Sequence, residues 1–323
     1  MSMMSLPEIT LKLTVKFILS CYLALSFCGL SSAEGVHVTD ADNKTVHINS
    51  SKRIVALNGS NTEILFALGA GERVVGCDLS STYPPKAKKL PNIGYQYRLN
   101  AEGILALKPE LVIGRRDAKP AQVITQLRAA GVATLLLKEP RNFDEAKVRI
   151  NKIGHAIGKD KQADKLIQKL EQDLLVLESK IKHLSLKAKK TALFLYLRGP
   201  QTAMVLGNKT GPGAMLVLSG AINCSGDIKD TRPMTAEAVV AAQPDVLILF
   251  ESGLKSIGGV EGLLKLPGIA QTPAGRNQRV ISIDGLFLSG FGVRSGKAAL
   301  ALFQAIYEKT GFTPVEFIAE SSD

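Results

Sequence analysis

Short apolar runs alternate with amphipathic stretches along most of the chain, and this alternation predicts its elements. The apolar runs predict strands at 53–57, 73–76, 111–114, 133–137, 191–197, 245–250 and 279–283. Helices are expected from a cap at Ser60 or Asn61 to Gly69, and over 101–107, 120–129, 212–219, 235–242, 260–265 and 293–309. Ahead of them, residues 35–48 alternate between apolar and polar side chains and predict a small hairpin. Strands that alternate with helices are typical of α/β layers with a mainly parallel sheet.

The middle of the chain has a different, helical period. Residues 143–184 contain no proline, and apolar side chains recur there at helical spacings: Ala163, Leu166, Ile167, Leu170, Leu174, Leu177 and Ile181. One apolar stripe of this kind predicts a long amphipathic helix, and Gly158 is expected to separate it from a shorter one. The predicted fold class is therefore α/β, with lobes over residues 34–142 and 189–323 joined by linking helices over 143–188.

An internal repeat relates the two lobes. Residues 99–113 align without gaps on residues 234–248, and both segments carry Ala-Glu near the start and Pro-acid before the strand. Each copy begins with a cap residue and a first-turn acid: Asn100 with Glu102, and Thr235 with Glu237. Any two helix–strand units share part of this pattern by chance. The fixed Ala-Glu and Pro-acid positions favour two pseudo-symmetric lobes.

The N-terminus predicts export. Lys12 and Lys16 precede a mostly apolar run over 17–30, and Ser31-Ser32-Ala33 follows. A basic region, a short apolar region and a small-x-small site describe a signal peptide, with cleavage expected after Ala33. The alternative is a membrane anchor, but the apolar run has about 14 residues and a bilayer span needs about 20. Lipid attachment at Cys21 or Cys28 is disfavoured because Leu19 and Phe27 fit poorly in the positions before them.

Composition narrows the class of protein. The roughly 290 residues that remain after cleavage exceed a usual single core and favour two domains. Only Cys77 and Cys224 remain, so a disulfide-built fold is excluded. The chain carries 40 Lys and Arg against 29 Asp and Glu, a net charge of +11. An exported protein without basic-aromatic motifs is not expected to bind nucleic acid, which leaves an anionic small ligand or simply a soluble basic surface.

Signs of an enzyme are scarce. The sequence contains no Gly-x-Ser-x-Gly elbow, no phosphate-binding glycine loop followed by Lys-Ser/Thr, and no His-Glu-x-x-His. His37 and His47 fall in the hairpin, and His155 and His183 on the central helices. Open α/β sheets bind ligands at the carboxyl ends of their strands, so a histidine-rich metal site in a cleft is disfavoured.

The loop over 91–99 is unusual because it gathers Tyr95, Tyr97 and Arg98 in a chain with six tyrosines and no tryptophan. Loops carry function disproportionately. A phenolate suits ferric iron, including haem iron. Free tyrosine has a pKa near 10, so ligation at neutral pH needs the metal and nearby positive charge, which Arg98 could supply. The alternative is an ordinary loop whose tyrosines pack against a neighbouring element.

Further arginines fall where loops that face a ligand are expected: Arg115, Arg116, Arg198 and Arg232. Guanidinium groups bind carboxylates bidentately, so these residues are candidates for an anionic ligand, with solvated surface charge as the alternative. The segment 284–294 offers Leu286, Phe287 and Phe291 either as an apolar wall or as core residues.

The chain resembles the periplasmic haem-binding proteins of ABC importers, within the cobalamin- and siderophore-binding class. The resemblance covers about residues 50–310. The class is marked by Arg53-Ile-Val-Ala-Leu57, Asn61-Thr-Glu-Ile-Leu65 and Leu107-Lys-Pro109, and the haem branch by Gly94-Tyr95 ahead of Asn100-Ala-Glu-Gly103. Later segments agree: Arg232-Pro233, Thr235-Ala-Glu237, Leu264-Lys-Leu-Pro-Gly268, Gln271-Thr-Pro-Ala-Gly275, Asp284-Gly285 and Gly290-Phe-Gly292.

The resemblance implies a haem site and assigns residues to it. Tyr95 falls on the family's axial haem ligand. The family often has arginine two residues later, where this chain has Tyr97 and the arginine is displaced to Arg98; whether Tyr97 supports or replaces Tyr95 is left open. Arg198 stands where some members carry a histidine that helps bind haem, and it could instead contact water opposite the iron or a propionate.

The resemblance also implies architecture and partners. Haem is expected in a cleft between two lobes that open only modestly. The partners are an inner-membrane permease and its ATPase, docked through Glu102 and Glu237, with an outer-membrane haem receptor upstream. Acids in the first turn also stabilise a helix without any partner. The runner-up is the same fold binding cobalamin or a ferric siderophore, and a more distant class is an exported enzyme or a structural adhesin domain.

Overall fold

The computed structural model describes residues 35–199 and 201–315 of the chain. The first lobe begins with a hairpin of strands β1 (Val36–Thr39) and β2 (Thr45–Ile48), as predicted. A four-stranded parallel sheet follows in the order β4 (Val74–Cys77), β3 (Ile54–Ala56), β5 (Leu111–Arg115) and β6 (Ala133–Leu137). β3 is buried on both faces, which explains its continuous apolar sequence.

The helices of the first lobe are α2 (Gly59–Ala67), α3 (Ala101–Leu105) and α4 (Ala121–Ala129), with 3-10 turns at Gly71–Arg73 and Pro85–Lys89. α2 begins earlier than predicted, because Asn58 rather than Ser60 or Asn61 caps it. The Asn58 side chain accepts a hydrogen bond from the Ser60 amide at 3.1 Å. With φ at 88°, Asn58 turns the chain directly from β3 into the helix.

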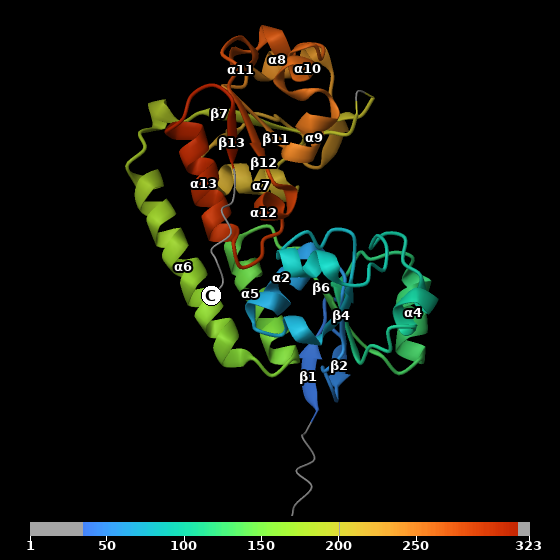
Figure 1. The fold of residues 1–323 in the computed structure, drawn as a ribbon. Coiled ribbons are helices and arrows are strands. Elements are labelled where there is room, and N and C mark those ends of the chain that lie inside the picture. Colours follow the sequence, from blue (N-terminus) through green and yellow to red (C-terminus); the bar gives the residue numbers. More distant parts are fainter. Residues whose placement is uncertain (1–34, 200, 316–323) are drawn as a thin grey trace, which may run out of the picture. The chain divides into compact units, whose positions relative to one another are not determined.

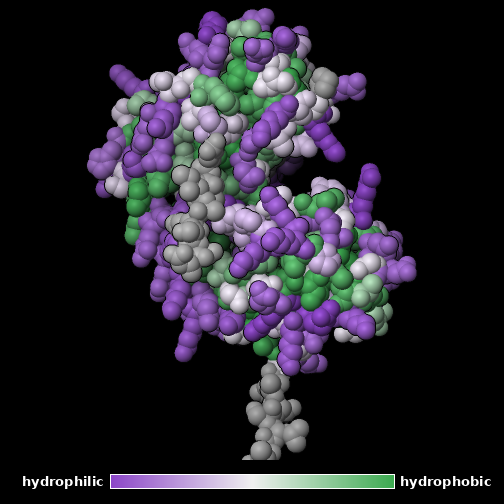
Figure 2. All heavy atoms as spheres, viewed as in Figure 1, coloured by the Kyte–Doolittle hydropathy of each residue, from purple (hydrophilic) through white to green (hydrophobic). Residues whose placement is uncertain are grey.

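Two consecutive helices link the lobes: α5 (Phe143–Ala156) and the 23-residue α6 (Asp160–Lys182). Gly158 lies between them with φ at 68°, so the predicted break is confirmed. α6 runs alongside α5 and α13 (Ser295–Tyr307) and buries Ala163, Leu170 and Leu177 of its apolar stripe (Figure 1). Its other side carries mostly hydrophilic side chains (Figure 2), although Leu175 and Val176 are also exposed.

The second lobe contains a seven-stranded sheet with both parallel and antiparallel pairs. Its hydrogen-bonded order is β10 (Thr231–Pro233), β8 (Ala203–Leu206), β7 (Thr191–Leu197), β11 (Val246–Phe250), β12 (Val280–Ile283) and β13 (Thr313–Val315), with β9 (Ile222–Asn223) beside β7. β7, β11, β12 and β13 pair in parallel, whereas β8 and β10 are antiparallel.

The remaining helices belong to the second lobe: α7 (Gly211–Leu218), α8 (Ala236–Ala242), α9 (Glu251–Ser256), α10 (Gly259–Leu264), α11 (Pro273–Arg276), α12 (Gly285–Ser289) and α13. Further 3-10 turns lie at Leu186–Ala188 and Ile269–Gln271. No helix of the described ranges is long and apolar enough to cross a membrane. The predicted signal, residues 1–33, lies outside those ranges.

The internal repeat corresponds to equivalent structural units. Asn100 caps α3 by accepting from the Glu102 amide at 2.9 Å, and Thr235 caps α8 by accepting from the Ala238 amide at 3.2 Å. Each helix leads into a strand that is paired on both sides in a parallel ladder, β5 in the first lobe and β11 in the second. The lobes are therefore pseudo-symmetric at this unit, as the alignment predicted.

A buried ion pair joins the two lobes. Arg294, which precedes α13, donates from Nε and Nη2 to the two carboxylate oxygens of Glu63 in α2, each at 2.7 Å. The guanidinium lies 3.8 Å from the ring centroid of Tyr83. Burial raises the pKa of Glu63, and the hydrogen bonds from Arg294 oppose that shift. Because a buried charge without its partner is costly, this pair holds α2 against the segment that enters α13.

Both cysteines of the described ranges, Cys77 and Cys224, are free thiols. Cys77 ends β4 and is buried, and Cys224 follows β9. Burial raises the pKa of both thiols, that of Cys224 to about 12. Neither thiol is therefore activated as a nucleophile or metal ligand.

Candidate functional site

The loop over 91–99 lies at the carboxyl edge of the first sheet. The Cys77 amide donates to the Pro91 carbonyl at 3.0 Å, and the Leu79 amide donates to the Gly94 carbonyl at 2.9 Å. On its other side, the Lys119 amide donates to the Gln96 carbonyl at 2.8 Å. Gly94 has φ at 86°, a conformation that favours glycine, immediately before Tyr95. The sheet thus fixes the backbone of the loop at both ends.

The two tyrosines of this loop differ in the hydrogen bonding of their hydroxyl groups. Their ring centroids are 5.2 Å apart in an edge-to-face arrangement. The Tyr97 hydroxyl donates to Oδ2 of Asp117 at 3.0 Å. The Tyr95 side chain is 44% exposed, and within the described residues its hydroxyl has no hydrogen-bond partner. Tyr95 therefore presents an oxygen that an incoming ligand can reach.

Burial is the main cause of a raised pKa at Tyr97, which reaches about 12. The nearby Arg115 opposes this shift, whereas the Asp117 charge and hydrogen bond add to it. Burial and the neighbouring acid therefore favour the protonated phenol over the phenolate at Tyr97.

Charged side chains at the ends of β5 and β6 form a continuous network. Arg115 donates to both carboxylate oxygens of Asp117, at 2.8 and 2.7 Å, and lies 3.1 Å from Glu139. Arg149 of α5 donates to the same Glu139 at 3.0 Å and to the Gly290 carbonyl of the second lobe at 3.2 Å. The Arg115 guanidinium lies 5.9 Å from the Tyr97 ring centroid. The network thus connects the tyrosine loop with an interlobe contact.

The predicted arginines lie in different environments in the structure. Arg115 lies over the ring of Tyr97, whereas Arg116 pairs with Asp42 of the hairpin turn at 2.7 Å. Arg98 is exposed, and its amide closes a turn on the Tyr95 carbonyl at 2.7 Å. Arg198 is exposed at the carboxyl end of β7, as predicted.

Arg232 and Phe287 are placed differently from the prediction. Arg232 lies within strand β10, opposite Val205 of β8, rather than in a loop. Phe287 is only 4% exposed and belongs to the hydrophobic core, so the core alternative is correct and Phe287 does not form an exposed wall. The reason is that α12 turns its apolar side inward beneath Arg294, whose guanidinium lies 5.1 Å from the Phe287 ring centroid.

Asp117, Glu139 and Arg149 were missed at the sequence level. Asp117 follows the end of β5 and Glu139 the end of β6 by two residues, a position at the carboxyl edge of the sheet that the predicted strands already indicated. Arg149 is 2% exposed on the side of α5 that also buries Ala146 and Ile150. A charged residue on an apolar helix face indicates a buried partner, and that pattern could have identified it.

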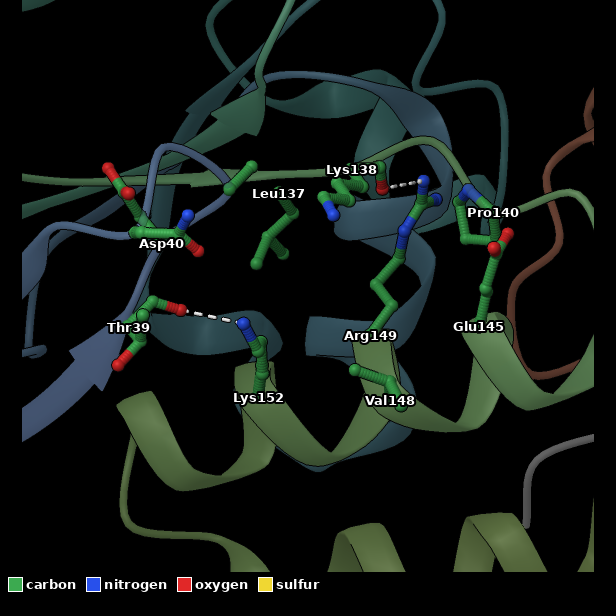
Figure 3. A pocket seen from close by; sticks show the side chains of 11 residues that line it. Thr39, Asp40, Leu137, Lys138, Pro140, Glu145, Val148, Arg149 and Lys152 are labelled. Carbon is green, nitrogen blue, oxygen red and sulfur yellow. Dashed lines mark hydrogen bonds between the residues drawn. The ribbon is translucent and has the colours of Figure 1, made fainter.

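Two of the hollows in the described part of the chain lie in the first lobe, away from Tyr95 and Tyr97. The first, of about 270 Å³, lies between the hairpin turn, the end of β6 and α5 (Figure 3). It falls just below the roughly 300–1,000 Å³ of small-molecule pockets. Lys152 closes one side of it by donating to the Thr39 carbonyl at 2.7 Å. The second, of about 720 Å³, lies beside α3 and α4 and is lined in part by Glu102, Leu105 and Val123.

The two predicted docking acids occupy equivalent positions. Glu102 and Glu237 are both exposed, and each is the second residue of its helix after the cap.

The sequence pattern of the periplasmic binding protein family matches residues 54–285, the greater part of the chain. The chain belongs to this family. Members of this family are periplasmic binding proteins. The two-lobe α/β fold described above is also the fold of haem-binding members of known structure.

Two solved structures of the periplasmic binding protein family are similar to the chain. The periplasmic heme-binding protein RhuT from Roseiflexus sp. RS-1, in its apo form, is 45% identical with a TM-score of 0.77, covering 80% of this chain and 99% of that one. The periplasmic heme-binding protein BhuT, in complex with two hemes, is 34% identical with a TM-score of 0.76 and the same coverage.

Relatives found by sequence are named either as ABC transporter substrate-binding proteins or as vitamin B12-binding proteins. The uncharacterized ABC transporter substrate-binding lipoprotein YvrC of Bacillus subtilis (strain 168) is 32% identical over 278 residues, covering 85% of this chain and 86% of that protein. The vitamin B12-binding protein of Yersinia pestis (strain Pestoides F) is 27% identical over 213 residues, covering 66% of this chain and 73% of its own.

Proposed function

We propose that the protein captures ferric haem in the periplasm and delivers it to an inner-membrane ABC importer. The observation that carries this proposal is Tyr95, a half-exposed tyrosine whose hydroxyl is unpaired among the described residues, at the carboxyl edge of the first sheet. Ligands of open α/β sheets bind at that edge. The similarity to haem-binding proteins of known structure supports the same ligand class.

In this proposal the Tyr95 phenolate binds the iron, and the porphyrin lies between the lobes. Haem is large and apolar, so its removal from water drives binding, while an anionic oxygen ligand favours Fe(III) over Fe(II). Arg98, Arg198 and Arg232 are exposed guanidinium groups and are assigned to the two propionates. The relatives are binding proteins by name, and no catalytic role is assigned to the chain.

The second candidate is the same fold binding cobalamin, which the similarity to a vitamin B12-binding protein favours. Tyr95 argues for haem, because a phenolate is a ligand for ferric iron. A ferric siderophore is the remaining alternative in this class.

The export step is also part of the proposal. Residues 1–33 are assigned as a signal peptide, so the mature protein is expected to begin at about Glu34. The net positive charge of the chain favours an anionic ligand. We assign the supply of that ligand to an outer-membrane haem receptor upstream.

The ligand is tested by titrating the purified mature protein separately with hemin, cyanocobalamin and a ferric siderophore, with binding followed by visible absorption and by tyrosine fluorescence. We expect a saturable hemin spectrum with a phenolate-to-iron charge-transfer feature and no saturation with the other two. Saturation with cyanocobalamin but not with hemin would show that the protein binds cobalamin rather than haem.

A further inference from the structure

Two sequence segments that carry the family resemblance meet between the lobes, and the proposed function uses neither of them. Asn61-Thr-Glu-Ile-Leu65 lies in α2 of the first lobe, and residues 284–294 of the second lobe contain α12 and the turn into α13. We call the contact between α2 and residues 284–294 the interlobe seam. The ion pair of Glu63 and Arg294 lies within it, and these side chains are only 4% and 10% exposed.

The ion pair is fixed in orientation as well as in charge. Both carboxylate oxygens of Glu63 accept from Arg294, from its Nε and Nη2 atoms, each at 2.7 Å. A bidentate pair constrains the plane of the guanidinium group, which a single contact would not do. The Cζ atom of Arg294 also lies over the ring of Tyr83, a residue of the first lobe, 3.8 Å from the ring centroid. Two groups of the first lobe therefore hold this side chain of the second lobe.

Glycines allow the two lobes to approach closely at the seam. A methyl group on Gly59 would come within 3.1 Å of Cδ1 of Leu286, and a methyl group on Gly290 within 3.4 Å of the Ser60 β-carbon. Arg149 donates to both sides of the same contact, to the Ser60 hydroxyl and to the Gly290 carbonyl at 3.2 Å. The seam is thus closely packed around its ion pair.

The turn that brings Arg294 to the seam contains an unusual backbone conformation. Phe291 has φ at 45°, in the left-handed region that bulky side chains rarely adopt. Its ring is fully buried, and the ring centroid lies 6.3 Å from that of Phe143 in α5. A conformation of this kind persists only where the surrounding contacts determine it strongly. The packing around Phe291 therefore fixes the path of the segment that carries Arg294.

We propose that Glu63 and Arg294 are positioning residues that hold the two lobes at one spacing, so that the haem cleft is preformed and releases its ligand slowly. The inference rests on the proposed function for the ligand, whereas the fixed spacing does not depend on it. α2 directly follows β3, so the seam borders the carboxyl edge of the first sheet, the edge that also carries the Tyr95 loop. A preformed site avoids the cost of ordering the lobes when the ligand binds.

Replacing the pair as a whole separates positioning from stability. Glu63→Ala alone leaves a buried guanidinium without its carboxylate and should lower the melting temperature. Glu63→Leu/Arg294→Met puts apolar groups in the same space, a kind of change that is often neutral or stabilising. The double variant should therefore melt close to the wild type but lack the directional contact. The exposed pair of Lys180 and Glu308, 2.9 Å apart, provides the matched control Lys180→Met/Glu308→Leu.

The lobe spacing is measured in the apo protein by double electron–electron resonance. Spin labels are attached at Gln126→Cys and Glu261→Cys, one exposed position in each lobe, with Cys77 and Cys224 replaced by serine. We expect one narrow distance distribution in the wild type and in the control variant, and a broader one in Glu63→Leu/Arg294→Met. Hemin release, followed by transfer to excess apomyoglobin, should be about tenfold faster in that variant, because the preformed cleft is lost.

Unchanged distances, or hemin release at the wild-type rate, in a double variant that melts like the wild type would overturn the positioning role. If the double variant does not fold, Arg294→Lys is measured instead. Lysine keeps the charge but cannot reproduce the bidentate and stacked contacts, so the same broadening is expected, and its absence would overturn the role equally. If the wild-type protein binds no hemin, the proposed function fails, while the distance measurement still decides whether the pair fixes the spacing.

Discussion

At the scale of single residues, the two neighbouring tyrosines show how local contacts decide chemical roles. Both come from one short loop and both are phenols, yet Tyr97 is bound to Asp117 and Tyr95 is open. The sequence indicated the pair and its loop, because tyrosines are few in this chain. Only the family resemblance ranked Tyr95 first. The residue pattern alone could not, because Asp117 is twenty residues further along and reaches Tyr97 only through the fold.

Asn58 provides a prediction at the same scale. It caps α2 through its side chain while holding φ at 88° and ψ at 127°, a conformation that glycine adopts more easily. Asn58→Ala should lower the free energy of unfolding by about 1–3 kcal/mol, because it removes the cap and keeps the strained backbone. Asn58→Gly should cost less, since it relieves the strain. Urea unfolding of both variants checks this, and equal costs would show that the backbone conformation contributes nothing.

At the scale of elements, the strongly periodic segments were predictable and several short ones were not. The strand at 191–197 and the linking helices agree closely with the apolar pattern, since each buries a long face. Strands β8, β9, β10 and β13 were missed, although the equally short β3, β4 and β12 were predicted from their apolar runs. Arg232 was misplaced because β10 was missed. Pairing with β8, rather than local pattern, makes its segment a strand.

At the scale of the whole molecule, the repeated helix–strand units present one exposed acid from each lobe. Replacing both Glu102 and Glu237 by alanine should abolish haem-stimulated ATPase activity of the reconstituted importer, because the proposed pairing with permease arginines is lost. Hemin binding should be unchanged, because both acids are exposed in the first turns of their helices and neither is assigned to the haem. The acids also favour their helix N-termini by about 0.3–1 kcal/mol each. If the double variant still stimulates the ATPase fully, the two acids only stabilise their helices and do not dock the permease.

The central claim is that Tyr95 binds ferric haem through its phenolate, and the visible spectrum of hemin complexes of two matched variants tests it most directly. Tyr95→Phe keeps the ring and removes the oxygen, so we expect loss of the phenolate-to-iron feature and severely weakened binding. Tyr97→Phe makes the same chemical change two residues away and should keep the feature. The reverse result would make Tyr97 the ligand. Wild-type spectra from both variants would contradict haem ligation by this loop altogether.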